Sequence, residues 1–287
     1  MTLHLRQLQP SDRYGARAVA RNVLPLFVLL ILAPILAARS VAAAWSLAPL
    51  VGLFLYRITI VMHDCAHRSL FRSARVNDWI GSLLGAVSGI DIRRFRAQHS
   101  KHHRMYGRAG DPQGFHYLGV QRMSRAQFAW HLVKPLFGAN LRYVLRESML
   151  HPGNFWRASR RGDSVVFLSV QFLIIIVVTG GGRHLHLALL PFVSAATFGL
   201  FLSQLRGLAE HGSINAVDQA GHVRSHSACA VEQLLLYDLH FNYHTAHHRW
   251  PQCPSLYLPQ VHEQYLAAPL DPSMLATVTS IRAGDRS

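Results

Sequence analysis

Cysteine is scarce in this sequence of 287 residues, and several common redox and hydrolase motifs are missing. The three cysteines, Cys65, Cys229 and Cys253, are widely spaced and form no C-x-x-C pair. Neither a disulfide framework nor a thiolate zinc site is therefore indicated. The chain also contains no H-E-x-x-H, no dinucleotide-binding glycine fingerprint and no iron–sulfur cysteine set. A zinc metalloprotease is consequently unsupported, and any electrons that the chain uses must come from a separate protein.

Charged residues are also few, and this limits the class of protein. They make up 15% of the chain, the apolar residues make up 50%, and the mean hydropathy is +0.16. A usual soluble domain has about a quarter of its residues charged. These values argue against disorder, which needs low hydrophobicity and high charge. They fit poorly with a purely soluble enzyme and are too polar for a bundle that lies wholly in the membrane. We therefore expect a chain with one part in the membrane and another part in the cytosol.

Four uncharged runs identify the membrane part. Residues 22–38, 40–56, 164–182 and 187–205 hold 17, 17, 19 and 19 residues, and a membrane-spanning helix needs about 17–25. We therefore predict four transmembrane helices near 22–38, 40–62, 164–182 and 187–205, with both termini on one side. Arg57 lies within the second apolar segment, near its end, and we expect it to snorkel to the interface.

The positive charge follows this topology. The net charge is +15, but 26 of the 29 basic residues fall in 1–21, 63–163 and 206–287. The two short connections on the other side hold only Arg39 and Arg183. This bias places the long segments and both termini in the cytoplasm, so no nucleic-acid partner is needed to explain the charge. The chain has only two lysines, a weak sign of a GC-rich bacterial gene, and we expect a bacterial inner membrane.

The segment 124–150 alternates large apolar side chains with basic ones. The apolar residues include Trp130, Phe137, Leu141 and Leu145, and the basic ones include Lys134, Arg142 and Arg146. This pattern suits helices that lie on the membrane face. A solvated helical lid is the alternative.

Histidine is unusually abundant, with 19 residues, and most of them are clustered. The clusters read H-x-x-x-H at 63–67 and H-x-x-H-H at both 99–103 and 244–248, and His211 stands apart from them. On a helix, residues i, i+3 and i+4 share one face, so each cluster can direct its imidazoles to one point. The first cluster begins where the second apolar segment ends, and His211 follows the fourth closely. We therefore expect ligands from both helical hairpins to meet just under the bilayer.

Nine grouped imidazoles are more than one metal ion uses. Structural zinc takes four ligands and catalytic zinc three, so nine ligands suit two metals. Imidazole binds iron, zinc, copper and nickel, and the spacing alone does not name the metal. Two metals at a membrane face, without a thiolate, suggest a di-iron site for oxygen activation. The histidines outside these groups are interpreted as surface or core residues.

At these residues the chain resembles the membrane fatty acid desaturase/hydroxylase family. Residues 63–67, 99–103 and 241–248 look like its three histidine boxes, and residues 206–212 resemble the segment that leaves its last spanning helix. The likeness covers roughly residues 20–266 of a single domain, 1–287. The spacing of the first box is similar to that of acyl-lipid members. One departure is Ala246, which stands where many members carry Glu, so any carboxylate role there is absent or moved.

The resemblance implies an all-α integral membrane protein, with four transmembrane helices and a cytoplasmic helical cap that holds a histidine-rich di-metal site. It implies two iron ions, O2 as co-substrate and an external electron donor of the ferredoxin, flavodoxin or cytochrome type. The implied reaction introduces a carbon–carbon double bond into an aliphatic chain, most simply an acyl lipid. The implied metal ligands are His63, His67, His99, His102, His103, His211, His244, His247 and His248.

Five further polar residues are candidates to orient the imidazoles from behind. They are Asp64, Asp111, Glu210, Asp238 and Asn242. For each of them, a purely structural cap or a surface position is an equally open interpretation.

Two other functions stay open at this point. A relative of the same family would act on a non-lipid metabolite, such as a dihydrorhizobitoxine-type compound derived from an amino acid, or would hydroxylate its substrate. A protein of a different class would be a histidine-rich metal carrier. Carriers place ligands within their spanning helices, and the four uncharged runs contain no histidine, which argues against a carrier.

Overall fold

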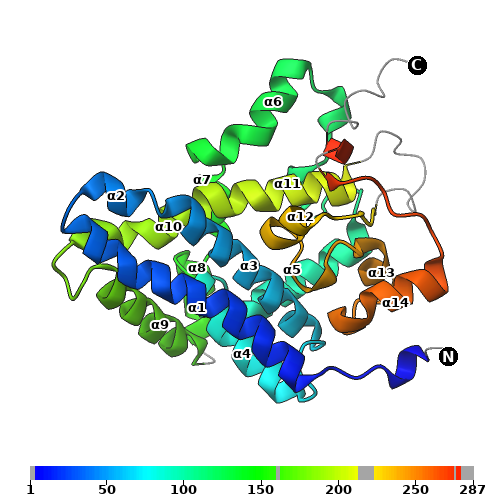
Figure 1. Ribbon diagram of the computed structural model, residues 1–287, viewed down its shortest axis with the longest axis horizontal. Helices are drawn as coiled ribbons and strands as arrows, with labels where there is room; N and C mark the ends of the chain where they lie inside the picture. The colour runs from blue at the N-terminus through cyan, green and yellow to red at the C-terminus, as the bar shows by residue number, and fades with distance from the viewer. Residues whose placement is uncertain (1–3, 160–161, 213–222, 275, 279–287) are drawn as a thin grey trace.

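The computed structural model describes residues 4–159, 162–212, 223–274 and 276–278, and helices dominate this part of the chain (Figure 1). The N-terminal half consists of η1 Leu5–Gln7, α1 Asp12–Ala37, α2 Val41–Trp45, α3 Ala48–His67, α4 Ala74–Ser88, α5 Ile92–Met105, η2 Gly114–His116, η3 Val120–Arg122, α6 Arg125–Val133, η4 Lys134–Phe137 and α7 Leu141–Glu147. The C-terminal half consists of α8 Pro152–Ser159, α9 Asp163–Val178, η5 Leu185–Leu189, α10 Leu190–Ser194, η6 Ala195–Gly199, α11 Leu200–His211, α12 Ala230–Leu235, η8 Asp238–His240, α13 His244–Arg249, η9 Ser255–Tyr257, α14 Leu258–Val261 and η10 His262–Leu266.

Three helical stretches are long and apolar enough to cross a membrane. They are Asp12–Ala37, Val41–His67 and Leu185–His211, and they overlap three of the four predicted spans. The first begins ten residues before position 22, because the side chain of Ser11 caps α1 by accepting a hydrogen bond from the Tyr14 amide at 3.3 Å. The second continues to His67, so the first histidine cluster is the last turn of a long apolar helix.

The third predicted span, 164–182, is a shorter helix in the structure. Helix α9 has 16 residues, which corresponds to about 24 Å at 1.5 Å per residue. The hydrocarbon core of a bilayer is about 30 Å thick. Gly180, Gly181 and Gly182 all adopt positive φ angles of 60–91°, a conformation that ends the helix. Three helical stretches are thus long and apolar enough to span a membrane, and the apolar helix α9 falls short of the predicted length.

Large apolar side chains are exposed on α1 and α9, as expected of helices that face lipid. On α1 they include Leu24 at 61% and Val28 at 60% exposure, and on α9 they include Val165 at 65% and Phe172 at 67%. By contrast, most of α3 is buried, and the helix lies at the centre of the fold. It is this buried helix that carries the first histidine cluster.

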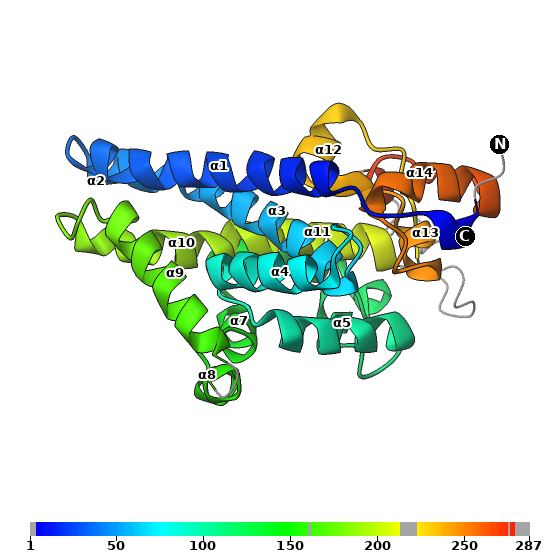
Figure 2. The same cartoon turned by 90° about the horizontal axis from the view of Figure 1, so that it is seen from below.

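The two ends of the molecule differ. Helix α2 and the connection from α9 to η5 lie at one end, whereas α5, α13 and α14 gather at the other (Figure 2). Helix α3 and η6 pack very closely between these ends. A Cβ on Gly52 would lie only 2.7 Å from the carbonyl oxygen of Ser194, so a glycine is needed at this crossing. The histidine clusters lie at the end that α5 and α13 form.

Arg57 does not reach the interface as expected. The residue is 6% exposed, and its guanidinium donates to Asp238 at 2.9 Å and to Asn22 at 2.7 Å. Arg21 also pairs with Asp238. The expectation of snorkelling is wrong because α1 and η8 supply a buried carboxylate and an amide within reach. This polar network joins α1, α3 and η8.

Candidate metal centre

All nine predicted histidines come together in two adjoining groups. Helix α3 supplies His63 and His67 from its last turn, and α5 and α13 supply three histidines each at helical spacing. His211 is the last residue of α11. The five-histidine group consists of His63, His67, His99, His103 and His247, and the four-histidine group consists of His102, His211, His244 and His248. In each group the nearest ring nitrogens all lie within 4.8 Å of one another.

Ring nitrogens face one another directly inside the five-histidine group. The Nε2 atom of His99 lies 2.7 Å from Nε2 of His63 and 2.8 Å from Nε2 of His103. The Nε2 atoms of His103 and His247 are 3.2 Å apart. Three helices therefore aim their imidazole lone pairs at one small volume.

The four-histidine group is built in the same way and touches the first. The Nε2 atoms of His244 and His211 are 3.0 Å apart. The rings of His103 and His248, one from each group, have centroids 4.3 Å apart. Because α5 contributes to both groups through neighbouring residues, one helix fixes their relative position.

The electrostatics of the two groups favour metal binding over protonation. Burial lowers the pKa of His103 to about 3, and burial together with the neighbouring rings holds the pKa values of His99 and His247 well below the ordinary histidine range. These imidazoles are neutral at pH 7, and a neutral imidazole is the form that binds a metal ion.

Unsatisfied nitrogens give a direct test of whether the residues fit a metal. Among the described residues, the buried Nε2 atoms of His67, His102 and His248 have no hydrogen-bond partner. A buried polar atom without a partner costs about 1–3 kcal/mol, and a metal ion at the centre of each group would satisfy these lone pairs. The donor set, all imidazole and without thiolate, fits iron as well as zinc, copper or nickel.

Asp111 holds one of these imidazoles from behind. Its Oδ1 lies 2.9 Å from Nδ1 of His102, and the amide of Gln113 donates to the same oxygen at 2.8 Å. The hydroxyl of Tyr117 donates to Oδ2 of Asp111. The ring of Tyr117 also stacks on His211, with centroids 5.1 Å apart. Tyr117 was not predicted from the sequence, since no spacing rule connects a lone tyrosine with the boxes.

Asp64 and Glu210 also lie against the histidines. Oδ1 of Asp64 is 3.2 Å from Nδ1 of His63, and Oε2 of Glu210 is 3.4 Å from Nε2 of His244. Arg206 donates to the same Glu210 oxygen at 3.2 Å. Each carboxylate therefore lies close enough to a ring nitrogen to influence which nitrogen of that imidazole carries the proton. Asp64 does so in the five-histidine group and Glu210 in the four-histidine group.

Asp238 and Asn242 have other partners. Asp238 belongs to the buried network with Arg57 described above. The side chain of Asn242 donates to the carbonyl oxygen of His226 at 2.9 Å, which ties the segment before α12 to the third histidine cluster. These hydrogen bonds stabilise packing around the site, and none of them is made to one of the nine clustered histidines.

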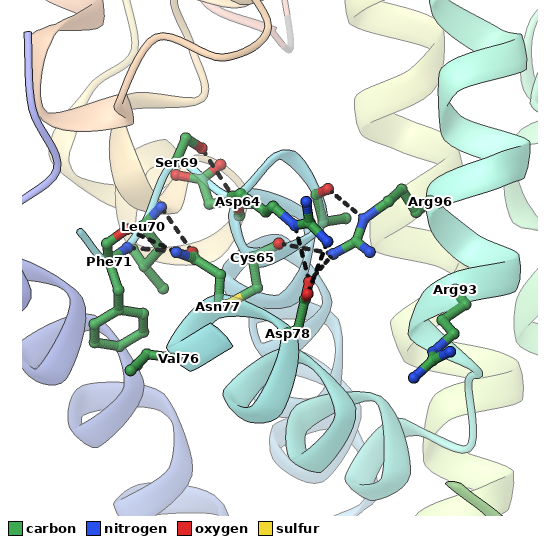
Figure 3. A network of polar contacts seen from close by, with 12 residues as sticks. Asp64, Cys65, Ser69, Leu70, Phe71, Val76, Asn77, Asp78, Arg93 and Arg96 are labelled. Atoms are coloured by element: carbon green, nitrogen blue, oxygen red, sulfur yellow. Dashed lines mark hydrogen bonds and ion pairs between the residues drawn. The ribbon is translucent and has the colours of Figure 1, made fainter. Parts of the chain in front are cut away.

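A polar network fixes the first cluster against the second (Figure 3). Arg96 of α5 donates to the carbonyl oxygen of Ala66 at 2.7 Å and to Asp78 of α4 at 2.6 Å. Arg68 takes a left-handed conformation, with φ 58°, and ends α3 immediately after His67. The amide of Asn77 then holds the following turn by donating to the Phe71 carbonyl at 2.7 Å. The end of α3 is thereby locked to both α4 and α5.

A cavity of about 610 Å³ reaches the five-histidine group from the spanning helices. His63 and His99 of that group line it, as do Leu55 of α3 and Leu200 of α11. The cavity therefore joins the five-histidine group to the apolar helices α3 and α11.

Comparison with known proteins agrees with this architecture. The family model described as fatty acid desaturase matches residues 39–277. The fatty acid desaturase of Bacillus subtilis (strain 168) is 23% identical over 281 residues, which cover 90% of this chain and 78% of that protein.

Two cyanobacterial proteins match shorter parts. The sn-1 oleoyl-lipid 12-desaturase of Arthrospira platensis is 36% identical over 70 residues, which cover 23% of this chain and 20% of that protein. The sn-1 acyl-lipid omega-3 desaturase (ferredoxin) of Synechocystis sp. is 25% identical over 132 residues, or 43% of this chain and 36% of that protein. Since the family model covers most of the chain and all nine clustered histidines, this chain belongs to the fatty acid desaturase family.

Proposed function

We propose that this protein is a di-iron, O2-dependent desaturase that introduces a carbon–carbon double bond into the acyl chain of a membrane lipid. The observation that carries the proposal is the pairing of two histidine groups with a cavity that runs between spanning helices. An aliphatic chain can enter such a cavity from the bilayer without crossing water. The names of two relatives, which are acyl-lipid desaturases, support the choice of substrate.

The metal ions would supply the oxidising power, with all nine histidines as their ligands. The reaction balances when two hydrogens leave adjacent carbons, two electrons arrive from a carrier, two protons are taken up from the solvent, and O2 is reduced to two molecules of water. The protein's own part is to hold the chain and to exclude water. Leu55, Ile60 and Leu200 give the cavity an apolar wall for this purpose.

The electrons would come from a separate protein. The sequence has no flavin or nicotinamide fingerprint and no iron–sulfur cysteine set. One relative carries ferredoxin in its name, which supports a donor of that type. A flavodoxin or a cytochrome would fill the same role.

The proposed location is a bacterial inner membrane, with the histidine groups and both termini in the cytoplasm. The distribution of 26 basic residues supports this orientation. Helix α9 would cross most of the bilayer as a fourth, short span. Reporter fusions at Gly181 and at the C-terminus test the orientation, and a periplasmic C-terminus would contradict it.

The function is tested by expression in a host that lacks desaturases, together with an electron donor. The lipids and polar metabolites are then analysed by mass spectrometry. New unsaturated fatty acids that depend on O2, and that vanish in His102→Ala, would support the proposal. An unchanged fatty acid profile beside a new hydroxylated or unsaturated polar metabolite would contradict it.

A further inference from the structure

The cavity has two chemically different regions. One is apolar and is lined by Leu55 and Ile60 of α3, Ala195 of η6 and Leu200 of α11. The other, the polar end, is lined by Arg94 of α5 and by Arg146 and Glu147 of α7, which contact one another. A space with an apolar region and a charged region suits an amphiphile, with its tail in the first and its head in the second.

The charge at the polar end is positive. Glu147 is shared between two arginines, because its Oε2 accepts from Arg94 at 2.6 Å and its Oε1 lies 3.4 Å from Nε of Arg146. Two cationic side chains therefore face one carboxylate. The side chains of Arg94 and Glu147 are each 23% exposed, and that of Arg146 is 76% exposed. Arg146 consequently has most of its hydrogen-bonding capacity available to a ligand.

Helix α7 exposes apolar side chains beside its arginines. Leu141 and Leu145 are 38% and 40% exposed, and Phe137, just before the helix, is 71% exposed. Apolar residues exposed beside arginines are typical of a helix that lies in the headgroup region. Arg146 directly follows Leu145 and is also exposed, so in a helix of this kind its guanidinium would lie at the level of the lipid phosphates.

We propose, on the basis of the proposed function, that the cavity selects amphiphiles with an anionic head group and that Arg94 and Arg146 bind that head group. The acyl tail lies along α3 and η6, and the chain passes His63 and His99 between its two ends. A phospholipid phosphodiester with net negative charge fits this arrangement better than a zwitterionic lipid, since a choline cation would meet the excess positive charge. A free fatty acid carboxylate offers the same anionic chemistry.

The experiment measures lipid binding directly and so does not depend on turnover. The full chain is purified in detergent, and its binding of phosphatidylglycerol, of phosphatidylcholine with the same acyl chains, and of palmitic acid is measured by native mass spectrometry. Arg146→Gln is the main variant. Arg142→Gln is the matched control, because Arg142 lies one turn earlier on α7, is exposed, and does not line the cavity. Arg94→Gln is tested as well.

The expected result is that the anionic amphiphiles bind better than phosphatidylcholine, by roughly fivefold or more, and that Arg146→Gln removes most of this preference. Arg142→Gln should keep it. A stronger retention of palmitic acid than of phosphatidylglycerol would identify the carboxylate as the anionic head. Equal binding of both phospholipids, or equal loss of preference in the two α7 variants, would overturn the proposal.

A separate desaturation assay on the same lipids keeps the two proposals apart. Selective binding without any new double bond would contradict the proposed reaction and leave the head-group site supported. Desaturation of both phospholipids with equal KM would support the reaction and overturn the head-group site.

Discussion

Nδ1 of His102 and Oδ1 of Asp111 lie 2.9 Å apart, and both side chains are almost completely buried. A carboxylate behind an imidazole fixes its tautomer, since the proton then stays on Nδ1 and the lone pair on Nε2 points to the metal. The Nε2 atom of His102 is one of the buried nitrogens without a partner among the described residues. Asp111 therefore prepares His102 as a ligand before any metal arrives.

Asp111→Asn should weaken metal binding in the four-histidine group. Loss of such a supporting partner typically costs about 10–100-fold in metal affinity or activity. Tyr117→Phe should act in the same direction and more weakly, because the carboxylate would remain. Metal per chain is measured after dialysis against a chelator. Asp163→Asn serves as a control, since Asp163 pairs with Arg93 at the surface end of α9, and full metal retention in Asp111→Asn would contradict the assignment.

Substitution of a clustered histidine should reduce activity and bound iron far more than substitution of a lone histidine. His102→Ala and His247→Ala are each expected to abolish product formation and to lower the bound iron, because each removes one imidazole from a closed group. His186→Ala should behave like the wild type, since His186 is exposed at the opposite end of the molecule. Activity and metal content are measured on the same preparations. Normal activity in either clustered variant would remove the basis for the site.

The close crossing of α3 and η6 should not tolerate a larger residue. In Gly52→Ala, the new methyl group would meet the Ser194 carbonyl and Cβ of Phe198, both at 2.7 Å. Overpacking of this kind costs about 1–3 kcal/mol, so we expect a lower Tm in detergent. Leu50→Ala on the same helix is the control, because Leu50 is 47% exposed. An unchanged Tm in Gly52→Ala would show that the two helices separate easily.

The metal-free protein should lose stability on acidification. Burial lowers the pKa values of His103 and His116 to about 3, whereas in an unfolded chain they are about 6.5. The unfolded state therefore binds more protons between these values, and stability is complete above pH 6.5 and falls as the pH drops towards 3. Thermal melts across this range test the slope. It should be shallower in His116→Asn and unchanged in His186→Asn, and equal slopes in all three proteins would contradict the account.

The histidine groups were predictable because helical spacing determines them. The i, i+3 and i+4 pattern of His99, His102 and His103 requires a shared helix face, and α5 provides it. The spacing did not reveal that the three histidines of this face belong to two different groups. His99 and His103 lie in one group and His102 in the other, because neighbouring positions on the face point towards different partner helices.

Other features depend on contacts between distant parts of the chain. Arg57 is buried only because Asp238, far along the sequence, lies opposite it. Tyr117 reaches Asp111 through a loop whose path no periodicity describes. The length of α9 depends on the glycine turn that follows it, whereas a count of uncharged residues continues through that turn.

The central claim is that nine histidines form two metal sites that hold iron. Metal analysis of the full chain, purified in detergent after expression in iron-replete medium, tests it most directly. The account predicts two irons per chain, falling in His102→Ala and unaltered in His186→Ala. One zinc per chain and no iron would contradict it.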